Sequence, residues 1–254
     1  MVTAGSLPMA TEADKGPGCA PGVAEYSDAW QDIMIEAAGR LGIDLPRAKA
    51  RLFARHGREL ALWNRKINLT AVSDPVQVAC RHFADSVAAL KYLRAGGKVL
   101  DLGSGGGFPG LPLKIMRPEI DLVLVDGSGK KVNFIKHVIR TLGLDNTRAL
   151  HARAEEMAAD HRWQGHFDHV VCRALGTVVQ VASLALPLLA PEGRLLIWKA
   201  GRWQEKEADF TPGGDGSRFT IAVGATVLEA VSHPYRLPGG SDSRQIVELM
   251  RRKA

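Results

Sequence analysis

The feature that most constrains this chain is a run of glycines directly after a short apolar strand. Residues 99–102 read Val-Leu-Asp-Leu and are followed by glycines at 103, 105, 106, 107 and 110. Glycine tolerates positive φ and lets another group approach the backbone closely. In an open α/β sheet such a loop lies at the carboxyl edge of the strands, where ligands bind. The run therefore predicts a parallel sheet with a ligand site at its first strand.

Short apolar strands and amphipathic helices alternate after this point. The expected strands cover residues 98–102, 121–126, 147–151, 167–173 and 194–199, and the expected helices cover 111–116, 130–142, 155–160 and 177–189. This order is typical of an α/β fold with a doubly wound, Rossmann-like, mainly parallel twisted sheet. Segments 219–227 and 245–250 look like strands with no helix between them, which predicts a terminal antiparallel strand pair.

The chain before this pattern divides into two parts. Residues 1–22 are rich in Gly, Pro and Ala without periodicity and are expected to form a disordered lead-in. Residues 23–93 are expected to form a small helical subdomain, with helices near 30–41, near 46–64 and from the N-cap Asp74 onward. Gly96 and Gly97 then mark the boundary to the Rossmann-like domain, residues 94–254.

Cysteine spacing and hydropathy exclude several classes of protein. Cys19, Cys80 and Cys172 form no C-x-x-C pair and no cluster with histidine, so neither a disulfide framework nor a metal site is expected. The longest apolar stretch, 178–190, is too short to span a bilayer, and no secretory signal is evident. We expect a cytoplasmic protein with no membrane partner, and a monomer, because no segment is typical of a dimer element.

Arginines gather along one face of the second helix. The formal net charge of +6 is by itself weak evidence for a polyanionic partner. Without an intervening acid, one stripe carries Arg47, Arg51, Arg55, Arg58 and Arg65. A solvated face is the alternative reading, but five arginines favour contact with phosphates. Lys130 and Lys131, at the start of the helix over 130–142, are further candidates for binding RNA.

Two cofactors compete for the glycine loop. The dinucleotide fingerprint G-x-G-x-x-G can be placed on Gly105, Gly107 and Gly110, but this frame begins beyond the end of the strand. The frame D-x-G-x-G-x-G instead uses Asp101, Gly103, Gly105 and Gly107. A carboxylate at the strand end suits S-adenosylmethionine, which carries an ammonium and a sulfonium in place of a pyrophosphate. The second frame is favoured and predicts the class I fold of S-adenosylmethionine-dependent methyltransferases.

A second acid, Asp126, ends the next strand about twenty residues on. At that position a carboxylate can accept hydrogen bonds from the two hydroxyls of a ribose. Both cofactors contain a ribose, so this residue does not distinguish between them. The alternative is a residue that merely starts the following helix.

Several motifs, in order along the chain, resemble those of one known family. They are Trp63-Asn64-x-x-Ile67-Asn68-Leu69-Thr70, Arg81-His82-x-x-Asp85-Ser86, the glycine loop with Pro109-Gly110-x-Pro112-Leu113, Val125-Asp126 with Lys130-Lys131-Val132-x-Phe134, Arg153-Ala154-Glu155-Glu156, Asp168 with Arg173-Ala174, and Lys199-x-Gly201. The combination resembles the ribosomal small-subunit methyltransferase G family, also called glucose-inhibited division protein B. The resemblance runs from about Trp30 to the C-terminus.

The resemblance implies an activity and a set of site residues. The family transfers a methyl group from S-adenosylmethionine to N7 of guanine 527 in 16S rRNA, which makes 16S rRNA or the small ribosomal subunit the implied partner. The implied donor-site residues are Gly103, Phe108, Ala154, Glu155 and Arg173, and the last motif adds Lys199 on the RNA side. Ala154 and Glu155 would border the adenine, and Arg173 would lie at the active edge. The segment 127–129, Gly-Ser-Gly, departs from the family's usual Ser-x-x and could loosen the ribose turn.

Methylation of guanine N7 makes modest demands on an enzyme. N7 has a free lone pair at pH 7, so no general base is needed, and alignment of the reacting atoms at about 3–3.5 Å suffices. Because the product base is cationic, Arg173 is expected to contact a phosphate, O6 or the donor carboxylate; an arginine that caps a strand end is the alternative. Arg81 and His82 are candidates for facing the guanine or the RNA, although a lone histidine is as often a packing residue. Cys172 has no base nearby and is expected to pack in the core.

Three other functions stay open at this point. A small-molecule methyltransferase would use the same donor site, and activity on free metabolites would reveal it. A nicotinamide-dependent oxidoreductase would be distinguished by the cofactor that shifts the melting temperature. A non-catalytic RNA-binding protein would bind RNA without transferring a methyl group.

Overall fold

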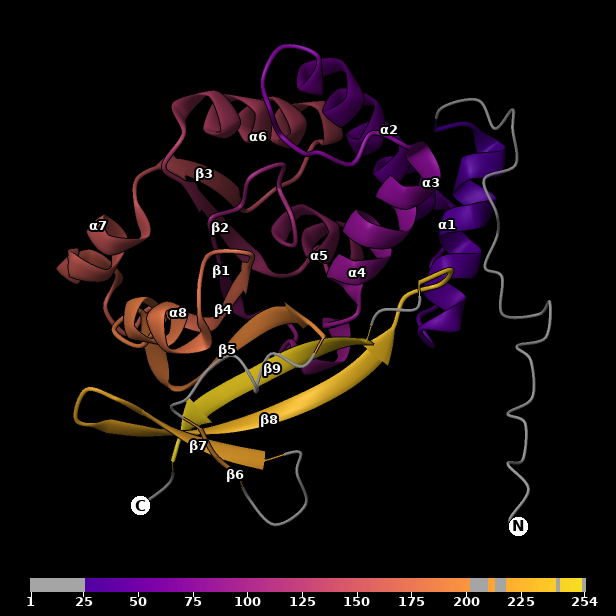
Figure 1. Ribbon diagram of the computed structural model, residues 1–254. Helices are drawn as coiled ribbons and strands as arrows, with labels where there is room; N and C mark the ends of the chain where they lie inside the picture. The colour runs from indigo at the N-terminus through magenta and orange to yellow at the C-terminus, as the bar shows by residue number, and fades with distance from the viewer. Residues whose placement is uncertain (1–25, 202–209, 213–217, 241–242, 253–254) are drawn as a thin grey trace, which may run out of the picture.

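Nine strands of the described chain form one sheet, in the order β3-β2-β1-β4-β5-β9-β8-β7-β6 (Figure 1). This computed structural model describes residues 26–201, 210–212, 218–240 and 243–252. The lead-in expected over 1–22 lies outside the described residues.

The first five strands are parallel and carry the glycine loop. β1 (Lys98–Leu102) lies between β2 (Asp121–Asp126) and β4 (Phe167–Arg173), and β3 (Thr147–His151) and β5 (Leu189–Ala200) flank this trio. Residues on both faces of β1 are buried, as expected of a parallel strand covered on both sides. The predicted Rossmann-like α/β fold is confirmed. The chain order reverses between β1 and β4, so the glycine loop leaves the sheet at the switch point where ligands bind.

Helices cover the two faces of the parallel strands. α5 (Gly110–Met116) and α6 (Gly129–Leu142) belong to one hydrophobic cluster, and α8 (Val178–Ala185), with Met157 of α7 (Ala154–Ala159), belongs to the other. α8 ends earlier than predicted and β5 begins earlier, because Pro187 cannot continue a helix.

The antiparallel end of the sheet is larger than the single pair predicted. β9 (Ser243–Arg251) lies between β5 and β8 (Thr226–Arg236), and β7 (Arg218–Val223) and β6 (Phe210–Pro212) follow outward. The segment 219–227, expected as one strand, contains most of β7, the turn at residues 224–225 and the first two residues of β8. Pro234 lies within β8 and argues against a strand there, so the remainder of β8 was not predicted from the sequence. Within the described residues β7 pairs with β8 as far as Val231, so no described strand pairs with Pro234 on that side, in keeping with the preference of proline for unpaired positions.

Two longer helices and several short helical turns precede β1, and α2 and α4 pack against α5 or α6. They are α1 (Asp28–Arg40), α2 (Arg47–Asn64), α3 (Pro75–Val78), a π-helical turn η2 (Ala79–Ala84), α4 (Asp85–Val87) and a 3-10 turn η3 (Leu90–Tyr92). Asp74 caps α3 as predicted, accepting from the Gln77 amide at 2.8 Å. One hydrophobic cluster runs from these helices into the sheet, so they share its core, and the domain boundary near residue 93 stays a prediction.

The π-helical turn was not foreseen. It carries Arg81 and His82 and widens the helix where the chain passes the carboxyl end of β4. Such turns occur often at functional sites, and this one directs attention to the residues around it.

Candidate active site

The glycine loop bends sharply where it leaves β1. Gly103, Gly105 and Gly107 have φ values of +72°, +55° and +85°, which only glycine adopts without strain. The amides of Gly103 and Ser104 both donate to the carbonyl of Val125, at 2.9 and 3.0 Å. A Cβ atom on Gly107 would lie 2.4 Å from Cδ1 of Leu111. The loop is therefore held against β2 and α5 in a conformation that requires these glycines.

Asp101 lies beneath this loop. Its side chain is completely buried, and Oδ2 accepts from the amide of Gly110 at 2.8 Å. Burial raises the pKa of this carboxyl to about 7. The side chain fixes the start of α5 and is not among the residues that line the cleft described below, so the part of Asp101 in binding the donor stays a prediction.

Asp126 joins the loop to β2 and also faces the ligand cleft. Its Oδ2 accepts from the amide of Gly105 at 2.9 Å, and its Oδ1 accepts from the amide of Ser128 at 2.8 Å. These two bonds fix the orientation of the carboxylate. Because each carboxylate oxygen has a second lone pair, Asp126 can still accept from a ligand.

A cleft of about 750 Å³ opens beside the loop, at the carboxyl ends of β1 and β2. It is lined by Gly103, Val125, Asp126, Gly127, Ala152, Arg153, Ala154, Glu155, Leu175, Gln180, Ser183 and Leu184. Four predicted donor-site positions meet here, at Gly103, Asp126, Ala154 and Glu155. The other five, Asp101, Gly105, Gly107, Phe108 and Arg173, are not among the lining residues. Leu175 and Gln180 were missed, because only the fold brings the segment after β4 next to β1.

The cleft fits a nucleoside of the size of S-adenosylmethionine. Its volume lies within the range of small-molecule sites, and Val125 and Leu184 supply apolar surface. At its deep end a Cβ atom on Gly103 would lie 3.0 Å from Cδ1 of Leu175, so a side chain there would fill the floor. Asp126 supplies the carboxylate that a ribose requires.

Arg173 lies at the carboxyl end of β4, among residues of the π-helical turn. Its Nη1 donates to the Arg81 carbonyl at 3.0 Å and to Oδ2 of Asp85 at 3.2 Å, while its Nη2 lies 3.2 Å from Nδ1 of His82. The guanidinium also lies over the ring of Phe108, 5.4 Å from its centroid. The sequence motifs that contain Phe108, His82 and Arg173 thus form one cluster next to the glycine loop.

Two neutral histidines sandwich Phe108. The rings of His56 and His82 each lie 4.9 Å from the Phe108 ring, both in stacked orientation. Burial lowers the pKa of His56 to about 4. Burial, and then the neighbouring Arg173 cation, lower the pKa of His82 to about 3. His82 is a half-buried, uncharged member of the cluster, whereas the Arg81 side chain is exposed, and contact of either residue with RNA stays a prediction.

The arginine stripe of α2 is partly used by the protein itself. Arg47 forms an ion pair with Asp32 of α1, Arg55 donates to a backbone carbonyl of α6, and Arg58 donates to a carbonyl just before α1 at 2.8 Å. These bonds fasten α2 to its neighbours. Arg51 is exposed, and contact between the stripe and phosphates stays a prediction.

The predicted RNA-binding lysines differ in their surroundings. Lys130 is exposed and Lys131 half-buried at the start of α6. Lys199 donates to the carbonyl of Gly176 at 2.8 Å. It therefore holds the loop after β4, a role that sequence reasoning did not anticipate.

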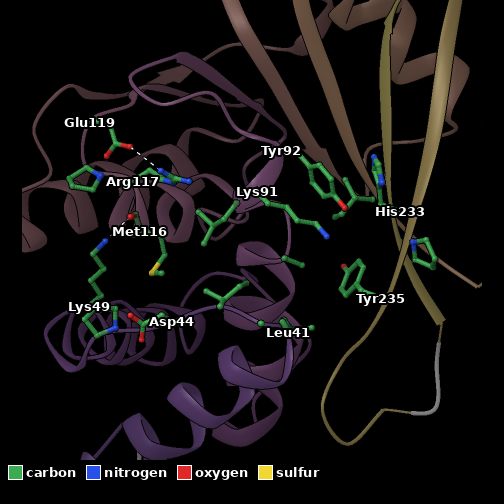
Figure 2. A pocket seen from close by; sticks show the side chains of 18 residues that line it. Leu41, Asp44, Lys49, Lys91, Tyr92, Met116, Arg117, Glu119, His233 and Tyr235 are labelled. Atoms are coloured by element: carbon green, nitrogen blue, oxygen red, sulfur yellow. Dashed lines mark hydrogen bonds and ion pairs between the residues drawn. The ribbon is translucent and has the colours of Figure 1, made fainter.

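A second cleft, of about 700 Å³, shares no lining residue with the first (Figure 2). It is bordered by the α1–α2 connection, η3, the end of α5 and β8, and no residue of the glycine loop lines it. Its cations are engaged, since Lys49 donates to the Met116 carbonyl at 2.6 Å and Arg117 pairs with Glu119 at 3.6 Å. The cleft at the glycine loop is therefore the candidate active site.

The described residues contain neither a candidate membrane span nor a candidate metal site. No helix in that part of the chain combines the length and apolarity needed to cross a bilayer. Within the same residues, no three His, Cys, Asp or Glu side chains are grouped so that they could hold a metal ion.

Comparison with known proteins decides the family. The profile of the rRNA small subunit methyltransferase G family matches residues 49–212. This chain belongs to that family. The methyltransferase G of Geobacter sp. (strain M21) is 39% identical over 222 residues, covering 87% of this chain and 97% of that protein. The methyltransferase G of Lactococcus lactis subsp. lactis (strain IL1403) is 33% identical over 225 residues, covering 87% and 91%.

The resemblance read from the motifs is therefore confirmed, over nearly the full length of these methyltransferase G relatives. Among solved structures, a SAM-dependent methyltransferase from Aquifex aeolicus is 18% identical, with a TM-score of 0.48, covering 70% of this chain and 94% of that chain. The assignment to the methyltransferase G family depends on the sequence relatives.

Proposed function

We propose that this chain transfers a methyl group from S-adenosylmethionine to N7 of one guanine in 16S rRNA, guanine 527 by the family resemblance. The observation that carries the proposal is the cleft at the glycine loop, where Gly103, Asp126, Ala154 and Glu155 meet in a member of the methyltransferase G family. The donor, when bound, supplies an electrophilic methyl group on a sulfonium.

The residues of the cleft have distinct tasks in this proposal. Asp126, already fixed by two backbone amides, accepts hydrogen bonds from the ribose hydroxyls. Ala154 and Leu184 border the adenine with apolar surface, and Glu155 lies beside them. The absence of a side chain at Gly103 leaves room for the donor next to Leu175. Together these residues orient the donor.

The side that receives the RNA needs no proton acceptor. The lone pair of guanine N7 is free at neutral pH, and His82, the nearest candidate base, already has its Nδ1 beside Arg173. Arg173 is the cation that would meet an oxygen atom of the RNA. Rate enhancement would then come from positioning, which alone can supply several kcal/mol.

Mapping of the methylated atom tests the proposal. The purified protein is incubated with labelled donor and either naked 16S rRNA or small subunits from cells that lack it. N7-methylguanine is located by borohydride reduction, aniline cleavage and primer extension. One labelled guanine is expected, and label at an exocyclic amine, at a ribose or nowhere overturns the proposal. Two controls replace the methyl donor by a nicotinamide cofactor and the RNA by free nucleotides, and neither is expected to give a methylated product.

Two variants that lose the same charge test whether donor binding depends on the cleft. Asp126→Asn places an amide group against a backbone amide donor and is expected to weaken donor binding by about tenfold or more. Asp145→Asn is the control, since Asp145 is exposed between α6 and β3, at the opposite edge of the sheet. Equal effects of the two substitutions would contradict the assigned site.

A further inference from the structure

Asp85 is a completely buried acid that side chains from four strands surround. Its Oδ1 accepts from the Tyr235 hydroxyl at 2.6 Å, and its Oδ2 accepts from Nη1 of Arg173 at 3.2 Å. Nη1 of Arg244 lies 3.8 Å from Oδ1, and Nε1 of Trp198 donates to the backbone carbonyl of Asp85 at 2.7 Å. β4, β5, β8 and β9 each contribute one of these groups.

Stability alone is a poor explanation for such an arrangement. Burying two charges costs several kcal/mol, and well-packed apolar residues are often at least as stable as a buried ion pair. What the pair does provide is a fixed orientation, because Arg173 has a planar guanidinium with directed donors. The orientation of the Arg173 guanidinium also determines where its remaining hydrogen-bond donors point.

His82 holds the other nitrogen of the same guanidinium. Its Nε2 lies 2.7 Å from Oγ1 of Thr70, and its Nδ1 lies 3.2 Å from Nη2 of Arg173. The same Nδ1 also lies 3.2 Å from the Arg81 carbonyl, which can only accept, whereas an arginine can only donate. That carbonyl already accepts from Nη1 of Arg173. In the arrangement that lets Nδ1 accept from Nη2, the ring proton is on Nε2, directed to Thr70, and His82 is a second restraint on Arg173.

Two donors of Arg173 are left over. Nε–H and the second hydrogen on Nη2 make no hydrogen bond within the described part of the chain. The side chain is 18% exposed, and its guanidinium carbon lies 5.4 Å from the centroid of the Phe108 ring in the glycine loop. The remaining donors are thus presented from a guanidinium that cannot rotate freely.

We propose that Asp85 and His82 are positioning residues, which fix the Arg173 guanidinium so that its free donors meet an oxygen acceptor of the bound RNA. This inference rests on the proposed function, because it takes Arg173 to contact the substrate. It states how two residues that contact neither the methyl donor nor the RNA hold Arg173 in place for that contact.

A double-mutant cycle tests it. Asp85→Asn is expected to lower kcat/KM for RNA by about tenfold or more, as misplacement of a contacting group does, while the donor Kd changes less than about twofold. In an Arg173→Ala background the same substitution should change kcat/KM by less than about twofold, because its effect passes through Arg173. An effect of equal size in both backgrounds would overturn the proposal.

A matched ion pair provides the control. Asp168 pairs with Arg94 at 3.2 Å, at the amino edge of the sheet, and Asp168→Asn should leave kcat/KM unchanged. Should Asp85→Asn fail to fold, Thr70→Val replaces it. That change removes the partner of His82 Nε2 and should lower kcat/KM only while Arg173 is present; a loss that persists in Arg173→Ala counts against the proposal.

A spectroscopic readout is independent of turnover. In nitrogen NMR spectra, the Arg173 side-chain signal, identified by its loss in Arg173→Lys, should show slow guanidinium rotation in the wild type and fast rotation in Asp85→Asn or Thr70→Val. Unchanged rotation in both variants overturns the inference. If the wild type methylates no RNA, the proposed function fails, and this measurement still decides whether Arg173 is held as we infer.

Discussion

Asp101 should make stability depend on pH in an unusual direction. Its pKa is raised from 3.8 to about 7, mainly by burial. Between these values the folded protein holds the proton more tightly than the unfolded chain does. The free energy of unfolding therefore falls as the pH rises through this window. One pKa unit corresponds to about 1.4 kcal/mol, so the whole shift amounts to about 4 kcal/mol.

Other buried groups act in the opposite sense. The pKa values of His56 and His169 are lowered to about 4 and that of His82 to about 3. A depressed histidine stabilises the fold fully above pH 6.5, and that stabilisation is lost as the pH falls toward the folded-state pKa. The total pH dependence of the wild type is consequently a mixture. The difference between wild type and Asp101→Asn isolates the acid.

Urea denaturation at a series of pH values from 4 to 8 measures that difference. Asparagine keeps an oxygen that can accept from the Gly110 amide but does not ionise. Relative to the wild type, Asp101→Asn should gain up to about 4 kcal/mol between pH 4 and pH 8. The exposed control Asp145→Asn should show no such gain. A flat difference for Asp101→Asn would refute the reasoning, and a large loss of donor affinity would show that its charge reaches the ligand after all.

Two further predictions concern packing. Gly107→Ala should lower the free energy of unfolding, measured in urea, by about 2–4 kcal/mol, because of left-handed backbone strain and the clash with Leu111. Gly143→Ala is the control, since Gly143 has φ +63° with no atom within 4 Å of an added Cβ and should show only the strain. Equal losses in the two variants would contradict the clash. Cys172 is buried, and burial raises the pKa of its thiol to about 12. In a chain whose other cysteines are replaced by serine, Cys172 should not react with a disulfide reagent at pH 8 until urea unfolds the protein. Reaction at the rate of a free thiol would count against this prediction.

The parallel half of the sheet could be predicted from the sequence, because the residue patterns that identify its strands and helices are local. Most of these strands are short apolar runs, with β3 (Thr-Arg-Ala-Leu-His) the exception, and the longer helices show their own period, so the elements could be placed without knowing their neighbours. The glycine loop was equally readable, since positive φ at Gly103, Gly105 and Gly107 is a demand on residue type alone. Family motifs then identified Arg173 and Phe108, which the fold places in contact.

The failures all depend on distant partners. β8 was missed because Pro234 argues against a paired strand, and only the fold shows which strands lie beside it. The bonds from the arginine stripe to α1 and α6 could not be foreseen, because the sequence does not show that these helices lie against it. The place of Asp101 beneath the loop likewise depends on the fold. Asp85 appeared only as a member of a family motif, and its contact with Tyr235, 150 residues away, depends on the fold.

The place of β9 in the sheet has a consequence for how the protein is made. Among the nine strands of the sheet β9 is synthesised last, yet it lies between β5 and β8. Before β9 is present, the hairpin that carries Tyr235 is not joined to the parallel half through this strand, and Arg244 is missing from the surroundings of Asp85. Contacts that close over such a long stretch of chain form slowly. A polypeptide that stops before β9 therefore cannot assemble the surroundings of Arg173.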